Sequence, residues 1–211
     1  MTEIPLILKL KKQNHKELAE AQDIMIENIF DVDDAVLHGG TAIWRCYKGK
    51  RFSEDIDLYL PNDKNVKKIF QSFENSGLIP IKKKVTKNSV YSKFKFKRVI
   101  VRFEALFKTK KNILIDYKLI DGNLITIYSL SAEELILEKI LAYQNRLKIR
   151  DLYDIFLLLK KVNDKSKIKK YLVGLINKFK SPIDESDLKY LIIEGIAPTS
   201  KKMLEYIKKW V

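Results

Sequence analysis

Apolar residues recur along the first sixty positions with two different periodicities, one helical and one strand-like. Residues 15–30 repeat them at the spacing of an amphipathic helix. The short apolar run Ala35–Leu37 then leads into a Gly-Gly-Thr turn, which we expect to be followed by a second helix. Residues 55–60 (DIDLYL) alternate instead, so the pattern predicts a strand with both carboxylates on one face.

The pattern after residue 60 predicts one helix and then a series of strands. Asn62 or Asp63 is expected to cap a helix over residues 64–75 that ends at Gly77. Strand-like runs follow at 78–86, 89–97, 99–107 and 112–119. Asp121-Gly122 then marks a tight turn into a last strand, ITIYSL.

The chain becomes helical from Ser131 onward. Ser131 and Glu134 have the spacing of a capping box, which opens a helix running to about Asn145. Further helices are expected at 150–161, 165–180, 184–193 and 199–210. We therefore expect an α+β protein, with a mixed sheet flanked by helices over residues 1–128 and a helical part over 129–211.

Composition excludes several classes of protein. The 211 residues are 46% hydrophobic with few glycines and prolines, which favours a globular protein with a sizeable core. Cys46 is the only cysteine, so an intramolecular disulfide or a multi-cysteine metal site is excluded. No apolar stretch approaches the ~18 residues of a membrane span, and the N-terminus does not resemble a signal peptide. We expect a cytoplasmic protein with no membrane partner.

The net charge of +14 is concentrated in one part of the chain. Residues 81–111 hold twelve basic side chains and a single acidic one, Glu104. Within this stretch Tyr91, Lys93 and Lys95 alternate with apolar or small residues, which predicts a strand with one wet, basic face. Such a field favours a polyanionic partner.

Two motifs near the N-terminus carry chemistry. Gly39 and Gly40, followed by Thr41, allow a backbone turn to approach a ligand, and N–H groups at the start of a helix suit phosphate oxygens. On the following strand, Asp55 and Asp57 place two carboxylates on one face, where they can hold a hard cation such as Mg²⁺. Together the motifs describe a site for a metal-bound nucleoside triphosphate. No P-loop, dinucleotide fingerprint or nucleophile elbow accompanies them.

These residues carry a family resemblance. HGGTAIWRCYKGKRFSEDIDLYL resembles the signature of the AbiEii/AbiGii-type nucleotidyltransferases, a DNA polymerase β-like family that includes the MenT toxins. Residues 51–57 match its RFSxDxD pattern, and residues 138–161 resemble its lysine-containing helix followed by an RDLYDL-type helix. The resemblance implies a polymerase β-like nucleotidyltransferase fold whose helical part contributes to the active site.

The resemblance also implies roles for individual residues. Gly40 and Thr41 would belong to the phosphate-binding turn, and Asp55 and Asp57 would be metal ligands. Many polymerase β-like enzymes take a third carboxylate from a neighbouring strand, and Asp116 is a candidate for it because it lies on a strand-like run.

Two further site residues follow from the second matching segment. Lys139 matches the family lysine that contacts the triphosphate, and Asp151 matches the acidic residue that completes the site. On a helix, Lys139 shares a face with Tyr143 and Arg146, while Asp151 shares one with Asp154. Asp151 could orient Lys139 or act as a base on the acceptor hydroxyl, and the sequence leaves both roles open.

The expected activity is transfer of a nucleoside monophosphate from an NTP, with Mg²⁺ or Mn²⁺, to a hydroxyl acceptor. The resemblance implies RNA as the acceptor, at the 3′ end of tRNA, and the role of a toxin in a toxin–antitoxin or phage-defence pair with a cognate antitoxin as partner. Two alternatives remain open. One is transfer to a small molecule or a protein hydroxyl, and the other is a non-catalytic RNA-binding protein on the same fold.

Overall fold

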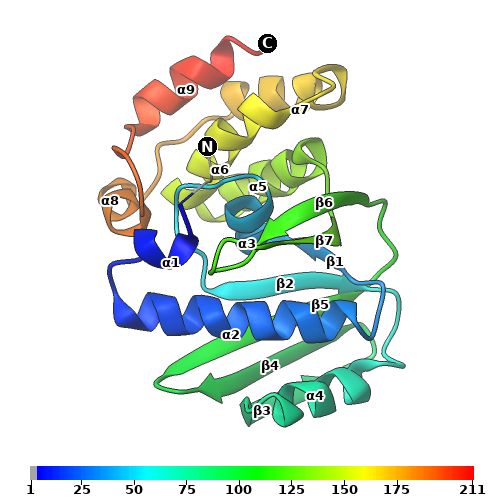
Figure 1. Ribbon diagram of the computed structural model, residues 1–211. Helices are drawn as coiled ribbons and strands as arrows, with labels where there is room; N and C mark the ends of the chain where they lie inside the picture. The colour runs from blue at the N-terminus through cyan, green and yellow to red at the C-terminus, as the bar shows by residue number, and fades with distance from the viewer. Residues whose placement is uncertain (1–3) are drawn as a thin grey trace. The chain divides into compact units, whose positions relative to one another are not determined.

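Seven strands form one mixed sheet in the computed structural model, which describes residues 4–211 (Figure 1). In chain order they are β1 (Val36–His38), β2 (Asp55–Leu60), β3 (Ile79–Val85), β4 (Ser89–Phe96), β5 (Val99–Phe107), β6 (Ile113–Lys118) and β7 (Leu124–Ser129). Their order across the sheet is β3-β4-β5-β2-β1-β7-β6. β2 runs parallel to β5 and β1 parallel to β7, and the other neighbouring pairs are antiparallel.

The described residues up to Cys46 and residues 53–130 form one compact unit around this sheet. Its helices are α1 (Leu6–Lys9), α2 (Gln13–Phe30), α3 (Gly39–Cys46) and α4 (Val66–Asn75). Figure 1 shows α2 lying along the sheet. Phe73 of α4 contacts Phe94 and Phe103 edge-on, with ring centroids 5.3 and 5.7 Å apart, so the aromatic core binds this helix to β4 and β5.

A buried ion pair links α2, α3 and β6 of the same unit, in the half of the sheet that lies across β2 from β4 and β5. Arg45 of α3 is 2% exposed and forms an ion pair with Asp23 of α2. The hydroxyl of Tyr117, on β6, accepts a hydrogen bond from Arg45 at 3.0 Å and donates one to Asp23 at 3.1 Å. One buried charge pair therefore holds two helices and an edge strand together. Removing either partner would leave the other charge buried and unpaired, which destabilises the fold.

The alternation within β2 divides the sheet into two faces. Ile56 and Leu58 are fully buried on the face that packs against helices, whereas Asp55 and Asp57 point to the other. We call this second side the polar face, because it also carries Arg102 of β5 beside Asp55 and Glu104 beside Asp57. The side chains of Arg102 and Glu104 are each 40% exposed there.

Residues 47–52 and 131–211 form a second compact unit. Its elements are α5 (Ala132–Arg146), α6 (Ile149–Leu158), η1 (Leu159–Lys161), α7 (Ser166–Asn177), η2 (Glu185–Asp187), α8 (Leu188–Leu191) and α9 (Ser200–Lys208). Ser131 and Glu134 form the predicted capping box at the start of α5. None of the helices in residues 4–211 has the length and apolar composition needed to cross a membrane.

The segment 47–52, which the sequence pattern assigned to the first part, packs with the second unit. Phe52 N–H donates to the carbonyl of Leu191 at 2.9 Å, and Ile193 N–H donates to the carbonyl of Lys50 at 2.9 Å. This pairing explains why the helix expected over 184–193 is shorter, with a 3-10 turn and α8 covering 185–191: the chain leaves the helical path after α8 to pair with residues 50–52.

The predicted cap of α4 is also wrong. The helix begins at Val66, and its N-cap is Asn65, whose side chain makes no capping bond. Asn65 instead donates to Asp33 at 3.1 Å, while Asn62 accepts from the backbone of Lys64 at 2.9 Å in the preceding turn. The polar residues before this helix therefore stabilise the loop rather than the helix end.

Candidate active site

The two predicted metal-ligand carboxylates lie next to a third one on the polar face. Asp55 is in register with Arg102 and Asp57 with Glu104 across the parallel pair β2–β5. Asp55 Oδ1 accepts a hydrogen bond from Arg102 Nε at 2.9 Å, and Arg102 Nη1 lies 3.5 Å from Glu104 Oε1. The three carboxylates and one guanidinium form a single charged cluster.

The glycine turn contacts this cluster directly. Gly39 has φ +72°, and a Cβ built on it would lie 2.3 Å from Asp57 Oδ2, so only glycine allows this approach. Thr41 is fully buried and its hydroxyl donates to the carbonyl of Asp55 at 2.5 Å. Gly39 and Gly40 form the first turn of α3 rather than a separate turn before it. The turn and the carboxylates are therefore in direct contact.

Glu104 is the acidic residue that the sequence interpretation missed as a site residue. Burial and the carboxylate of Asp57 raise the pKa of Glu104, and Asp55 adds to this shift while Arg102 opposes it. Like charges brought together in this way favour binding of a cation between them. A signal was present in the sequence, since Glu104 is the single acid in a basic stretch and alternates with apolar residues on its strand.

Asp116 does not lie where the third carboxylate was expected, on a strand next to β2. It is on β6, the edge strand, which β1 and β7 separate from β2. Three strand spacings correspond to about 14 Å, far beyond the reach of a shared metal ion. Asp116 instead accepts a hydrogen bond from Thr126 at 3.3 Å. Glu104 occupies the neighbouring-strand position.

The donor set of the cluster suits a hard divalent cation. Carboxylate oxygens from Asp55, Asp57 and Glu104 are the ligands that Mg²⁺ prefers. Within residues 4–211, no group of three or more acidic, histidine or cysteine side chains is arranged so that it could hold a metal ion, so it is the chemical type of these donors, and not their present spacing, that suits the cation. Arg102 forms ion pairs with Asp55 and Glu104, so its positive charge balances part of the repulsion in the cluster.

A hollow of about 350 Å³ adjoins the carboxylates on the polar face. Asp57, Glu104 and Tyr91 contribute to its lining. His38 also lines it, and its ring stacks on Tyr59 with centroids 4.1 Å apart.

The second unit contains the other predicted site residues in one ionic network. Lys139 Nζ lies 2.9 Å from Asp154 Oδ2 and 3.5 Å from Asp151 Oδ1. Arg51 donates to both oxygens of Asp154 at 2.6 Å, and Arg146 donates to both oxygens of Asp151 at 2.7 Å. Both aspartates are fully buried. Three cations thus surround two carboxylates, which leaves one positive charge in excess.

The network holds both aspartates in charged contacts with cations. Burial alone would raise the pKa of Asp154, but Arg51 and Lys139 outweigh it and hold that pKa below its usual range. Both oxygens of Asp151 accept hydrogen bonds from Arg146, and the two roles that the sequence left open for Asp151, orienting Lys139 or acting as a base, stay predictions. The sequence did not identify Asp154 as the nearer partner of Lys139, nor Arg51 as the second cation bound to Asp154. Both residues lie in the segments that match the family.

Comparison with protein families gives one match to most of the chain. The model described as "Nucleotidyl transferase AbiEii toxin, Type IV TA system" matches residues 24–191. No curated protein sequence matches the chain.

Several solved structures share the fold. JHP933 from Helicobacter pylori has a TM-score of 0.69 at 19% identity, covering 94% of this chain and 92% of its own. Another structure from H. pylori gives a TM-score of 0.65 at 21% identity, with 95% of this chain and 96% of that chain covered. The nucleotidyltransferase toxin MenT4 from Mycobacterium tuberculosis gives 0.65 at 16% identity, with 97% of this chain and 90% of MenT4 covered. These likenesses confirm the expected α+β nucleotidyltransferase fold.

Proposed function

Because the chain belongs to the AbiEii family of nucleotidyltransferase toxins, we propose that it transfers a nucleoside monophosphate from an NTP to a hydroxyl at the 3′ end of tRNA. Mg²⁺ or Mn²⁺ is the expected cofactor, bound by Asp55, Asp57 and Glu104. The product is a new phosphodiester bond between the acceptor oxygen and the α-phosphorus, and the leaving group is pyrophosphate.

One observation carries this proposal: the phosphate-binding turn lies in direct contact with the carboxylates of β2. The Cβ position of Gly39 lies 2.3 Å from Asp57 Oδ2, and Thr41 is hydrogen-bonded to the backbone of Asp55. A triphosphate on the N–H groups at the start of α3 would therefore lie beside the oxygens that hold the cation. A glycine turn or an Asp-x-Asp strand without the other would not support this chemistry.

The chain's own residues supply positioning and charge. The turn at Gly39 and Gly40 orients the phosphates through backbone N–H groups. When bound, the divalent cation supplies charge for the transition state and lowers the pKa of the attacking hydroxyl. Arg102, paired with Asp55, is close enough to the cluster to help neutralise the phosphate oxygens.

Lys139 is proposed to contact the triphosphate as a fixed ammonium. Asp154 and Asp151 hold it in one orientation, so little side-chain entropy is lost when a phosphate oxygen binds. Lys139→Gln is expected to raise the KM for NTP at least tenfold. Lys148→Gln, which removes an exposed lysine paired with Asp184, provides the matched control and should leave KM unchanged.

The direct test is a transfer assay with tRNA, each labelled NTP and Mg²⁺. Glu104→Gln and Asp57→Asn are expected to abolish labelling, because each removes an oxygen ligand from the cluster. Asp116→Asn makes the same chemical change on the same sheet, three strands away, and should leave labelling intact. Equal labelling by the Asp57 and Asp116 variants would refute the proposed site.

The same assay distinguishes the acceptors. Small hydroxylated molecules and the protein itself are offered as acceptors in parallel with tRNA. Label that appears only on a small molecule or a protein, and not on tRNA, would contradict the RNA acceptor while leaving nucleotide transfer intact. No label on any acceptor with any NTP would contradict the activity.

The proposed cellular role is that of a toxin neutralised by a cognate antitoxin, as the family's description indicates. Induced expression of the chain alone should arrest bacterial growth, and the Asp57→Asn variant, expressed to the same level, should not. Growth arrest by both proteins would mean that toxicity does not depend on nucleotide transfer.

A further inference from the structure

The seven basic residues of β3, β4 and the turn at 97–98 fall into two structural groups. One group is neutralised: Lys83 pairs with Glu74 of α4, Lys97 with Glu20 of α2 and Arg98 with Glu17 of α2. The other group, Lys82, Lys84, Lys93 and Lys95, forms no ion pair with any acidic side chain of residues 4–211. Among these seven residues, the paired ones therefore contribute little outward field and the four unpaired lysines contribute most of it.

The unpaired group lies on the polar face, in line with the carboxylates. Lys93 is in register with Arg102, and Arg102 with Asp55. Lys82 continues the same row on β3. The row therefore extends outward from Asp55 over three strand spacings, about 14 Å.

A second row runs beside the first and contains an aromatic ring. Tyr91 is in register with Glu104, and Glu104 with Asp57. The ring centroid lies 5.3 Å from Lys82 Nζ and 6.0 Å from Lys93 Nζ. Tyr91 also lines the 350 Å³ hollow that reaches Asp57, so its ring is accessible from the carboxylates.

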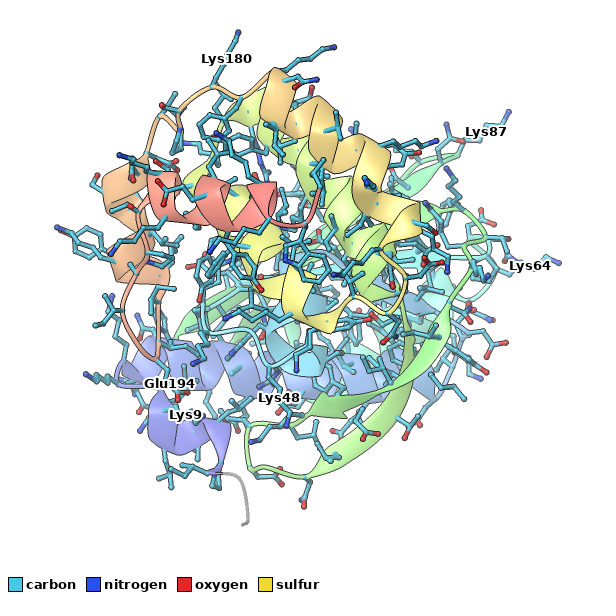
Figure 2. All side chains as sticks on the ribbon, turned by 90° about the horizontal axis from the view of Figure 1, so that it is seen from above. Lys9, Lys48, Lys64, Lys87, Lys180 and Glu194 are labelled. Atoms are coloured by element: carbon cyan, nitrogen blue, oxygen red, sulfur yellow. The ribbon has the colours of Figure 1, made fainter. Side chains whose placement is uncertain are left out.

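Protection of the sheet edge does not account for this arrangement. Lysines on an edge strand prevent aggregation by pairing of strands, and Lys82 and Lys84 on β3 would serve that purpose. Lys93 and Lys95, however, are on β4, which is paired on both sides. Lys87 adds a further cation at the β3–β4 turn, and Figure 2 shows its side chain extending away from the ribbon. The charge covers a surface rather than an edge.

We propose that this surface, Lys82, Lys84, Lys93 and Lys95 around Tyr91, binds the single-stranded RNA segment that leads to the acceptor hydroxyl. It is called the acceptor surface below, and the proposal rests on the RNA acceptor of the proposed function. The ammonium groups bind successive phosphates, and a base stacks on Tyr91. The rows then guide the terminal ribose toward Asp55 and Asp57.

The test measures RNA binding separately from catalysis. A short fluorescein-labelled single-stranded RNA and fluorescein-labelled tRNA are titrated with protein at several salt concentrations. Lys82→Glu/Lys93→Glu is expected to weaken binding at least tenfold and to reduce the salt slope by about 1.4, since each phosphate contact on a single strand contributes about 0.7. Tyr91→Leu should weaken binding by about 5- to 150-fold without changing the slope, because stacking is uncharged.

The matched control changes the same charge on the opposite side of the sheet. Lys67→Glu/Lys68→Glu replaces two exposed lysines of α4, which packs on the other face. This variant should keep both the affinity and the salt slope to within a factor of about three, which is the residual effect of net charge. Circular dichroism and thermal unfolding check that all variants are folded.

The outcomes separate this inference from the proposed function. Suppose that wild-type protein labels tRNA, but that Lys82→Glu/Lys93→Glu and Lys67→Glu/Lys68→Glu weaken RNA binding equally. The acceptor surface is then refuted and the activity stands. If binding differs between the pairs as predicted but no RNA is ever labelled, the surface stands and the acceptor is wrong. Loss of NTP binding in Lys82→Glu/Lys93→Glu would also refute the inference, because the change would then act on the nucleotide site.

Discussion

The replacement Gly39→Ala tests how tightly the phosphate-binding turn is built onto the metal-ligand carboxylates. At φ +72° the new residue would adopt the left-handed conformation, which costs about 1–2 kcal/mol for a residue with a Cβ. Its Cβ would also lie 2.3 Å from Asp57 Oδ2. That separation is roughly 1 Å shorter than a van der Waals contact, so the carboxylate must move.

The movement of Asp57 is expected to affect activity far more than stability. Mg²⁺ requires near-octahedral ligands at short distances, and a displacement of about 1 Å in a catalytic group can reduce the rate by ~100-fold. Gly39→Ala should therefore lower the transfer rate by about 100-fold or more. The free energy of unfolding should fall by only about 1–2 kcal/mol, as long as the Asp57 side chain can rotate away.

Gly77→Ala provides the matched control for backbone strain. Gly77 has φ +85°, in the same conformational region, and a Cβ there would have no atom within 4 Å. Urea unfolding should give the two variants similar losses of stability, while the transfer assay should show a rate defect in Gly39→Ala alone. Equal activity of the two variants would refute the close packing of Gly39 against Asp57 as a requirement of the site.

Three other measurements test the physical basis of the fold. Asp23→Ala should lower the free energy of unfolding by about 3–5 kcal/mol in urea, because Arg45 stays buried without its carboxylate; a change below about 1 kcal/mol would contradict this. The pKa of Asp154 is lower in the folded protein than in the unfolded chain, so its stabilisation is present above about pH 4 and is lost as the pH falls through the folded value. Acid titration of unfolding should therefore be flatter for Asp154→Asn, and an unchanged slope would count against it. Burial raises the pKa of Cys46 to about 12, so iodoacetamide at pH 8 should alkylate it slowly in native protein and rapidly in urea, as followed by mass spectrometry.

Local patterns predicted most of the elements around the site. The alternation in 55–60 identified β2 and placed both aspartates on one face, as the structure confirms. Ser131 and Glu134 predicted the start of α5 because a capping box involves only residues three apart. Where a helix boundary depends on distant partners, the prediction was wrong: the 184–193 segment leaves the helical path to pair with residues 50–52.

The same distinction separates the parts of the candidate site. The sequence by itself determined the glycine turn, the Asp-x-Asp strand and the charge excess over 81–111, because each is a pattern within a short stretch. Only the tertiary structure decided that β5 and not β6 lies beside β2, and hence that Glu104 and not Asp116 joins Asp55 and Asp57. Periodicity fixes which face of a strand a side chain occupies, whereas strand order results from packing and pairing between distant segments. The acceptor surface depends on both, since alternation puts its lysines on one face and strand order aligns them with the carboxylates.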